Sequence, residues 1–162
     1  MTMDAPTLLA LHQLYSEYAA VLDARELDRW PELFTEDGIY KLQSRENFDR
    51  GLPLATLAFE SRGMLKDRVY GAQETIYHDP YVQRHIVGLP RLLGRHATDR
   101  GEVLRCEANY LVIRTKRDAR PEILSVGRYL DHVVHTPEGL YFAKRLAFLD
   151  NDLIPNSIID PI

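Results

Sequence analysis

The alternation of apolar and polar residues in the second half is the feature that most restricts the fold of this chain. Three turn-like clusters, at 99–101, 118–121 and 137–139, divide residues 84–149 into four extended stretches. Within 103–113 the even positions are apolar or small and are separated by polar ones, which is the period of two typical of a strand. Strands joined by short turns, with no helix between them, form an antiparallel sheet. The pattern therefore predicts four strands of roughly ten residues each in one antiparallel sheet.

The first half has a helical pattern instead. Residues 6–26 carry apolar side chains at spacings of three and four, which places them on one face of a helix. The other expected elements are a short helix over 28–35, a strand over 39–44, a polar loop over 45–51, a strand over 52–59 and a helix over 61–74. Helices followed by a long meander define the α+β class, with the helices packed on one face of a curved, mostly antiparallel sheet that closes into a cone. The length of 162 residues fits a single domain over 1–162.

Cys106 is the only cysteine, and this excludes several classes of site. One cysteine cannot form an internal disulfide, a zinc ribbon or a cysteine-ligated iron–sulfur cluster. Cys106 lies on the apolar side of its expected strand, which favours a core position over a role as a nucleophile. The N-terminus lacks the basic segment of a signal peptide, and no apolar run is long enough to span a membrane. We therefore expect a cytoplasmic chain.

The net charge of −4 conceals an uneven distribution. Residues 1–37 contain eight acidic residues and two arginines, a net charge of −6, so the remainder carries +2. An acidic front argues against nucleic-acid binding, which needs clustered Lys and Arg. The 20 basic residues comprise 16 Arg and 4 Lys, and Arg is enriched at protein interfaces, although a high-GC codon bias would produce the same excess.

The tail over 150–162 combines two prolines with five Leu or Ile residues and has no regular period. Free tails are usually polar, so an extended apolar tail needs a surface to lie against. That surface belongs either to this domain or to a neighbouring chain. The content of isoleucine favours a neighbouring chain, and the tail is interpreted as an extended interface segment.

A catalytic site is only weakly indicated by the residues themselves. His85, on the first long strand, could meet Asp37 or Asp23 inside the cone and act with it as a general acid–base pair. A histidine hydrogen-bonded within a core or an interface is the more common arrangement. Metal binding is not expected, because the adjacent His78 and Asp79 rarely chelate one ion. The sequence contains no phosphate-binding or nucleophile-elbow motif.

Several stretches carry a resemblance to a known family. They are LQSRENFDRGLPLATL at 42–57, MLKDRVYGAQETIYHDPYVQRHIVGLP at 64–90, YLVIRTK at 110–116, TPEGL at 136–140 and IPNSIIDPI at 154–162. With them the chain resembles the small (beta) subunits of aromatic-ring-hydroxylating oxygenases, the Rieske non-heme iron enzymes. Among these it is most similar to subunits of enzymes that hydroxylate salicylate.

The resemblance implies a cystatin/NTF2-like cone that supports a catalytic alpha subunit, commonly in an α3β3 hexamer. The Rieske [2Fe-2S] cluster and the mononuclear Fe(II) would belong to that alpha subunit, with a ferredoxin and a reductase upstream, and this chain would hold no cofactor, no metal and no catalytic residue. The substrate class implied is a salicylate-like aromatic acid. The expected subunit contacts are Tyr77, His78, Tyr81, Arg84, Ile154, Pro155, Ile158 and Ile159.

Two other functions remain open from the sequence. One is a stand-alone isomerase or dehydratase of the same fold, using His85 with an acidic residue. The other is a binding module that holds a small ligand in its cone. An enzyme would turn over substrate alone and lose activity on His85→Ala, whereas a supporting subunit would be inert without an iron-containing partner.

Overall fold

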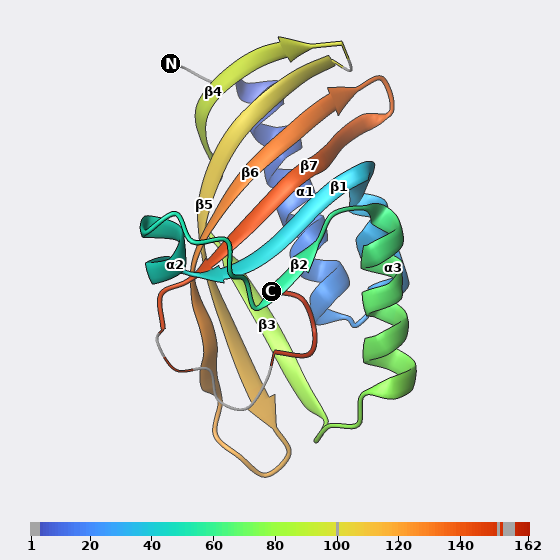
Figure 1. The fold of residues 1–162 in the computed structure, drawn as a ribbon, viewed down its shortest axis with the longest axis vertical. Coiled ribbons are helices and arrows are strands. Elements are labelled where there is room, and N and C mark those ends of the chain that lie inside the picture. The colour runs from blue at the N-terminus through green and yellow to red at the C-terminus, as the bar shows by residue number, and fades with distance from the viewer. Residues whose placement is uncertain (1–3, 100, 152, 154–157) are drawn as a thin grey trace.

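The computed structural model describes residues 4–99, 101–151, 153 and 158–162. Its helical elements are α1 (Ala5–Asp23), the 3-10 helix η1 (Leu27–Leu33), α2 (Arg45–Asp49), α3 (Arg62–Tyr70) and the π-helical turn η2 (Gly71–Thr75). Its strands are β1 (Phe34–Ser44), β2 (Leu57–Phe59), β3 (Tyr81–Val87), β4 (Arg91–Thr98), β5 (Gly101–Lys116), β6 (Glu122–Thr136) and β7 (Gly139–Leu149). Figure 1 shows the long strands crossing in front of α1, with α3 to one side.

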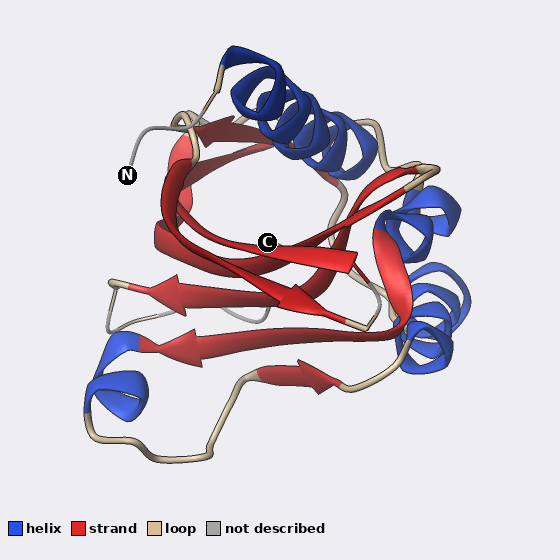
Figure 2. Cartoon of the chain, turned by 90° about the horizontal axis from the view of Figure 1, so that it is seen from above, coloured by secondary structure: helices blue, strands red, loops and turns tan. Residues whose placement is uncertain are grey.

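The strands form one strongly curved sheet. Its order is β2-β1-β7-β6-β5-β3, and β4 also pairs with β5. The β1–β7 pair is parallel and the other pairs are antiparallel. Figure 2 shows α1 spanning the open side of the curved strands. The expected α+β, NTF2-like cone with a mostly antiparallel sheet is confirmed.

Helix α1 forms where its spacing and its N-terminal cap predict it. The Asp4 carboxylate accepts a hydrogen bond from the Thr7 backbone N–H at 2.8 Å, and Pro6 occupies the first turn, where a missing N–H is harmless. The side chains that α1 buries are Leu11, Leu14, Tyr15, Tyr18, Val21 and Leu22. The helix ends at Asp23, and Arg25 then adopts a left-handed conformation with φ of 55°. These buried side chains pack against the inward face of the sheet, so α1 closes the cone.

Three predicted elements differ from the structure. The stretch over 84–98 is two strands, because Gly88 and Pro90 interrupt it, so the meander contains five strands. The predicted loop over 45–51 contains α2, which begins where the Ser44 hydroxyl accepts a hydrogen bond from the Asn47 backbone N–H. The predicted strand over 52–59 is reduced to β2. The helices predicted over 28–35 and 61–74 correspond to η1 and to α3 with η2.

Strand β7 contains a bulge, and beyond it the residues that would have pointed outward point into the cone. His132 pairs with Lys144, but the next residue of β6, Val133, pairs with Phe142, so one residue of β7 is extra. Both Phe142 and Arg145 therefore point into the cone, and both are fully buried. The expectation that 139–149 presents one continuous apolar face, with Lys144 as its exception, is wrong beyond this bulge.

Candidate functional site

The interior of the cone is held together by a buried ion pair. Arg145 on β7 donates from Nε and Nη2 to the two carboxylate oxygens of Asp131 on β6, at 3.0 and 2.8 Å, and neither side chain is exposed to solvent. The Tyr15 hydroxyl of α1 also donates a hydrogen bond to Asp131. This bidentate geometry is the strongest that an arginine and a carboxylate form. The pair joins two strands to the helix that covers them.

Aromatic rings surround the Arg145 guanidinium. Its central carbon lies 3.9 Å from the Phe142 ring centre and 4.0 Å from those of Tyr18 and Tyr129. Burial, together with the Asp131 carboxylate, raises the pKa of Tyr15 well above its ordinary value. Burial also raises the pKa values of Tyr18 and Tyr129, so these phenols stay neutral. The interior is thus filled by rings that pack on a cation already neutralised by Asp131.

The tail inserts its last residues into this same interior. Ile162 is fully buried, and its main-chain oxygen accepts hydrogen bonds from the hydroxyls of Tyr18 at 2.7 Å and Tyr40 at 3.2 Å. The Ile162 N–H donates to the Tyr40 hydroxyl at 3.0 Å. In Figure 2 the C-terminal end lies between the curved strands. The tail occupies the space where a ligand of the cone would have to bind.

Contacts further along the tail hold it in place. Arg68 on α3 donates to the main-chain oxygens of Ile158 and Ile159 at 3.1 and 2.5 Å, and Arg25 contacts the Asp160 carboxylate at 3.3 Å. Ile158 and Ile159 are 6% and 7% exposed. The preference for a neighbouring chain as the surface beneath these two residues is therefore corrected, because both side chains are buried in this domain's own core and Arg68 binds their main-chain oxygens. The calls on Ile154 and Pro155 lie outside the described residues.

His85 and Asp23 are brought together, as one of the sequence hypotheses required. The His85 Nδ1 lies 2.6 Å from the Asp23 carboxylate, and the His85 backbone N–H donates to both oxygens of that carboxylate at 3.0 Å. The pair ties the C-terminal end of α1 to β3. The His85 side chain has no exposed surface, and neither residue lines any of five well-formed hollows between described residues. Asp37 lies elsewhere, exposed on β1, where it accepts a hydrogen bond from Thr35.

Four expected subunit contacts lie on β3 or in the segment that precedes it, and two of the four are exposed. Tyr77 is 98% exposed, and Arg84 is also exposed. His78 and Tyr81 are half-buried, with their rings in edge contact at 5.4 Å. The Arg114 guanidinium packs over the Tyr81 ring at 5.5 Å. Tyr81 thus packs against His78 and Arg114, while Tyr77 and Arg84 are exposed.

The described residues do not fit a metal or an iron–sulfur cluster. Within the described ranges, no group of three or more His, Cys, Asp and Glu side chains could hold a metal ion. Cys106 is buried in the core, as expected, and burial raises the pKa of its thiol to about 12, which opposes formation of a thiolate ligand or nucleophile. No helix in the part that the structure describes is long and apolar enough to cross a membrane.

The fold is an α+β cone with a filled interior, and the comparison with known proteins names the family. The family model "Ring hydroxylating beta subunit" matches residues 17–156. The chain therefore belongs to the ring-hydroxylating beta-subunit family, and it is a beta subunit of the oxygenase component of such systems.

Individual relatives agree with this family. The chain is 32% identical to the anthranilate 1,2-dioxygenase small subunit of Burkholderia cepacia, over 100% of this chain and 98% of the relative. It is 27% identical to a terephthalate 1,2-dioxygenase beta subunit of Comamonas sp., over 90% and 92% of the two chains. A solved structure from Novosphingobium aromaticivorans, described as the beta subunit of an aromatic-ring-hydroxylating dioxygenase, superposes with a TM-score of 0.85 at 29% identity, over 96% and 97% of the chains.

Sequence reasoning missed the Asp131–Arg145 pair. The pattern of β6 places Asp131 between apolar neighbours on the inward side, which was the available signal. No residue of β7 marks the bulge that turns Arg145 inward, since the bulge contains neither glycine nor proline. An acidic residue on the inward side of one strand indicates a basic partner on a neighbouring strand.

Proposed function

We propose that this chain is a non-catalytic supporting subunit of a multicomponent oxygenase that acts on an aromatic acid. The observation that supports this most directly is the filled cone. The place where a cone of this fold would hold a substrate contains Ile162, three tyrosines and Arg145, whose charge is paired with Asp131. A general acid–base pair at His85 and Asp23 has no adjoining space for a substrate among the hollows described above.

The partner in this proposal is an iron-containing alpha subunit. It would carry both the Rieske [2Fe-2S] cluster and the mononuclear iron, in an α3β3 hexamer that receives electrons from a reductase through a ferredoxin. The poor fit of this chain's residues to either group supports that division. The exposed Tyr77 and Arg84, with Tyr81 and His78 behind them, are proposed as subunit contacts.

The proposed substrate is a salicylate-like aromatic acid. Two relatives are subunits of dioxygenases named for anthranilate and for terephthalate. Both of these compounds are aromatic carboxylates, which supports an aromatic acid as the class of substrate. Because the proposal assigns the reaction to the alpha subunit, the choice among aromatic acids would be made there.

The test is reconstitution. The chain purified alone, the cognate alpha subunit alone and the co-expressed pair are assayed for substrate-dependent oxygen uptake with salicylate, anthranilate, benzoate and terephthalate. We expect iron and activity only in preparations that contain the alpha subunit, and highest activity in the pair. Turnover by this chain alone, abolished by His85→Ala, would contradict the proposal and favour a stand-alone enzyme of the same fold.

A further inference from the structure

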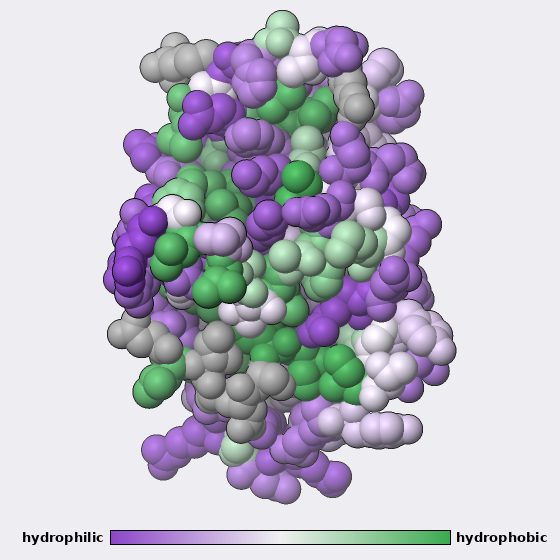
Figure 3. Space-filling view, in the orientation of Figure 1, coloured by the Kyte–Doolittle hydropathy of each residue, from purple (hydrophilic) through white to green (hydrophobic). Residues whose placement is uncertain are grey.

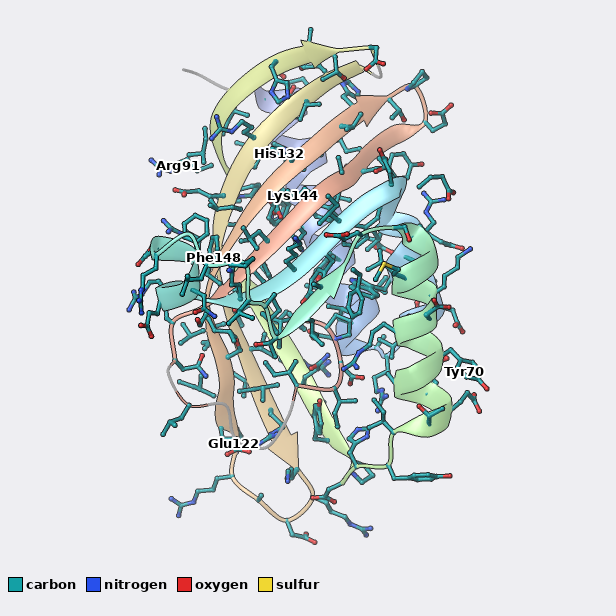
Figure 4. All side chains as sticks on the ribbon, viewed as in Figure 1. Tyr70, Arg91, Glu122, His132, Lys144 and Phe148 are labelled. Carbon is teal, nitrogen blue, oxygen red and sulfur yellow. The ribbon has the colours of Figure 1, made fainter. Side chains whose placement is uncertain are left out.

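A row of basic side chains crosses the face of the sheet that points away from α1. Arg105 on β5 pairs directly with His132 on β6, and His132 pairs directly with Lys144 on β7. All three residues line one hollow on that face. Figure 4 shows His132 and Lys144 beside each other on their neighbouring strands. We call Arg105, His132 and Lys144 the cationic row.

The cationic row has no acidic partner among the described residues. No ion pair within 4.0 Å joins Arg105 or Lys144 to any described carboxylate. Glu107, which follows on the same face of β5, already contacts Arg91 and Arg128. Like charges that face each other across strands destabilise a sheet. Arg105 and Lys144 lie on either side of His132, and an anionic partner would offset the repulsion between these two like charges.

The basic groups also affect the pKa of His132. Burial, the neighbouring Lys144 and Arg105, and His96 lower the pKa of His132, and only Asp131 acts in the opposite sense. The His96 ring lies 6.3 Å from that of His132. Asp131 points to the other side of the sheet, where Arg145 holds both of its oxygens. The Asp131 carboxylate therefore forms no ion pair with the cationic row.

Apolar side chains border the row on one side. A hollow of about 150 Å³ lies there, and its apolar walls are Phe48, Leu93, Leu130 and Leu146. Leu93 is 41% exposed, whereas the ring of Phe48 packs on Phe148 with centres 4.0 Å apart and so fixes one wall. In Figure 3, which views this face, hydrophilic and hydrophobic side chains lie next to one another over these strands. On the other side of the row a second hollow is lined in part by Glu36, Asp37 and Asp99, which would repel an anion.

We propose that the cationic row and the adjoining hollow of about 150 Å³ form a docking site for a segment of a partner subunit that bears a carboxylate beside an aliphatic or aromatic side chain. The carboxylate would lie against Arg105 and Lys144, and the apolar side chain between Leu93, Leu130 and Leu146. This inference rests on the proposed function, in which that partner is the alpha subunit. Charge complementarity of this kind sets partner choice and orientation.

A second copy of this chain is a poorer occupant. Residues 1–37 carry eight of its acidic side chains, and most of those carboxylates are already engaged. Glu17 and Glu26 contact Arg29, Glu36 contacts Arg62, Asp4 contacts Arg95, and Asp23 contacts His85. A free aromatic acid also fits poorly, because the hollow is open beside the exposed Leu93, whereas small-molecule sites bury most of their ligand.

The test is co-purification of the full chain with a tagged cognate alpha subunit. The double variant Arg105→Glu/Lys144→Glu should reduce the recovered chain by roughly tenfold or more, as expected when close charge pairs become repulsive. The matched control is Arg117→Glu/Arg120→Glu, which makes the same change of charge at the exposed turn between β5 and β6 and should leave recovery unchanged. Arg105→Lys/Lys144→Arg should retain most of the recovery, because it keeps both charges.

The outcomes are separable. If the wild-type chain does not co-purify, the proposed function fails and the docking site fails with it. If the wild type co-purifies and the Glu variant does so equally well, only the docking site is wrong. Should the Glu variant unfold, Arg105→Gln/Lys144→Gln replaces it, with thermal unfolding as the check of folding. Two other results would also overturn the proposal. One is that the Glu variant changes self-association in sedimentation while its binding to the alpha subunit stays intact. The other is that the chain binds benzoate saturably and that Lys144→Glu abolishes this binding.

Discussion

Two sides of the same pair of strands use charge in opposite ways. Asp131 and Arg145 pair across β6 and β7 and point into the cone, while the next cross-strand pair, His132 and Lys144, points outward. The inward pair is fully buried and compensated. The outward pair places a basic side chain on each strand, and Lys144 has no ion pair among the described residues. The inward charges thus join β6 to β7, whereas the outward basic groups make no such tie.

The largest expected effect comes from breaking the inward pair. Arg145→Met leaves the Asp131 carboxylate buried with only the Tyr15 hydroxyl as a partner, and it should cost about 3–5 kcal/mol of unfolding free energy. Urea denaturation of the isolated chain measures this. The control is Arg91→Met, which removes an exposed contact with Glu107 and should cost less than about 1 kcal/mol. Equal losses in the two variants would contradict the assignment of Arg145 as the internal tie.

The second effect concerns the tail that fills the same interior. Ile162→Ala removes a fully buried side chain from among the tyrosines and should cost about 2–4 kcal/mol of unfolding free energy. Leu153→Ala is the matched control, because Leu153 belongs to the same tail but is 85% exposed. Denaturant midpoints of both variants test the comparison. A loss of stability in Leu153→Ala as large as in Ile162→Ala would show that the tail is not anchored through Ile162.

The third effect is a dependence of tail anchoring on pH. Burial raises the pKa of Asp160 above its ordinary 3.8, and the nearby Arg25 only partly opposes this. An acid whose pKa is raised on folding stabilises the fold below its ordinary pKa, and this contribution is lost as the pH rises through the raised value. The unfolding free energy of the wild type should therefore fall as the pH rises through the pKa of Asp160, and Asp160→Asn should remove this fall. The measurement is the difference in unfolding free energy between the wild type and Asp160→Asn from pH 4 to 7, and a difference that is constant with pH would contradict it.

The sequence predicted those parts of the fold that depend on local pattern. The spacing within 6–26, with Asp4 as a cap, was sufficient for α1, and the alternation within 103–113 was sufficient for β5. The split of 84–98 into β3 and β4 was marked by Gly88 and Pro90 but was not recognised. Local signals thus covered α1, α3 and the class of fold, but not α2.

The features that were missed depend on contacts between distant segments. The bulge in β7 appears only when β7 is paired with β6, so neither the inward turn of Arg145 nor the alignment of the cationic row can be read from β7 alone. The choice between Asp23 and Asp37 as the partner of His85 likewise required the position of α1 against β3. The folding of Ile162 into the cone depends on Tyr18 and Tyr40, which lie 144 and 122 residues away.

The smallest expected effect tests the outward side of the comparison in the isolated chain. Lys144→Gln removes one of the like charges beside His132 and should raise the unfolding free energy by about 0.2–1 kcal/mol, although it weakens docking under the inference above. Because His132 has a lowered pKa, the wild-type chain should lose stability as the pH falls below 6.5, the ordinary pKa of histidine. Arg105, Lys144 and His96 disfavour protonation of His132, and Asp131 favours it. Lys144→Gln should thus reduce the loss below pH 6.5, as measured by urea denaturation from pH 5 to 8. If the variant were less stable than the wild type throughout that range, Lys144 would stabilise this sheet, which would contradict the expectation that its charge is unfavourable in the isolated chain.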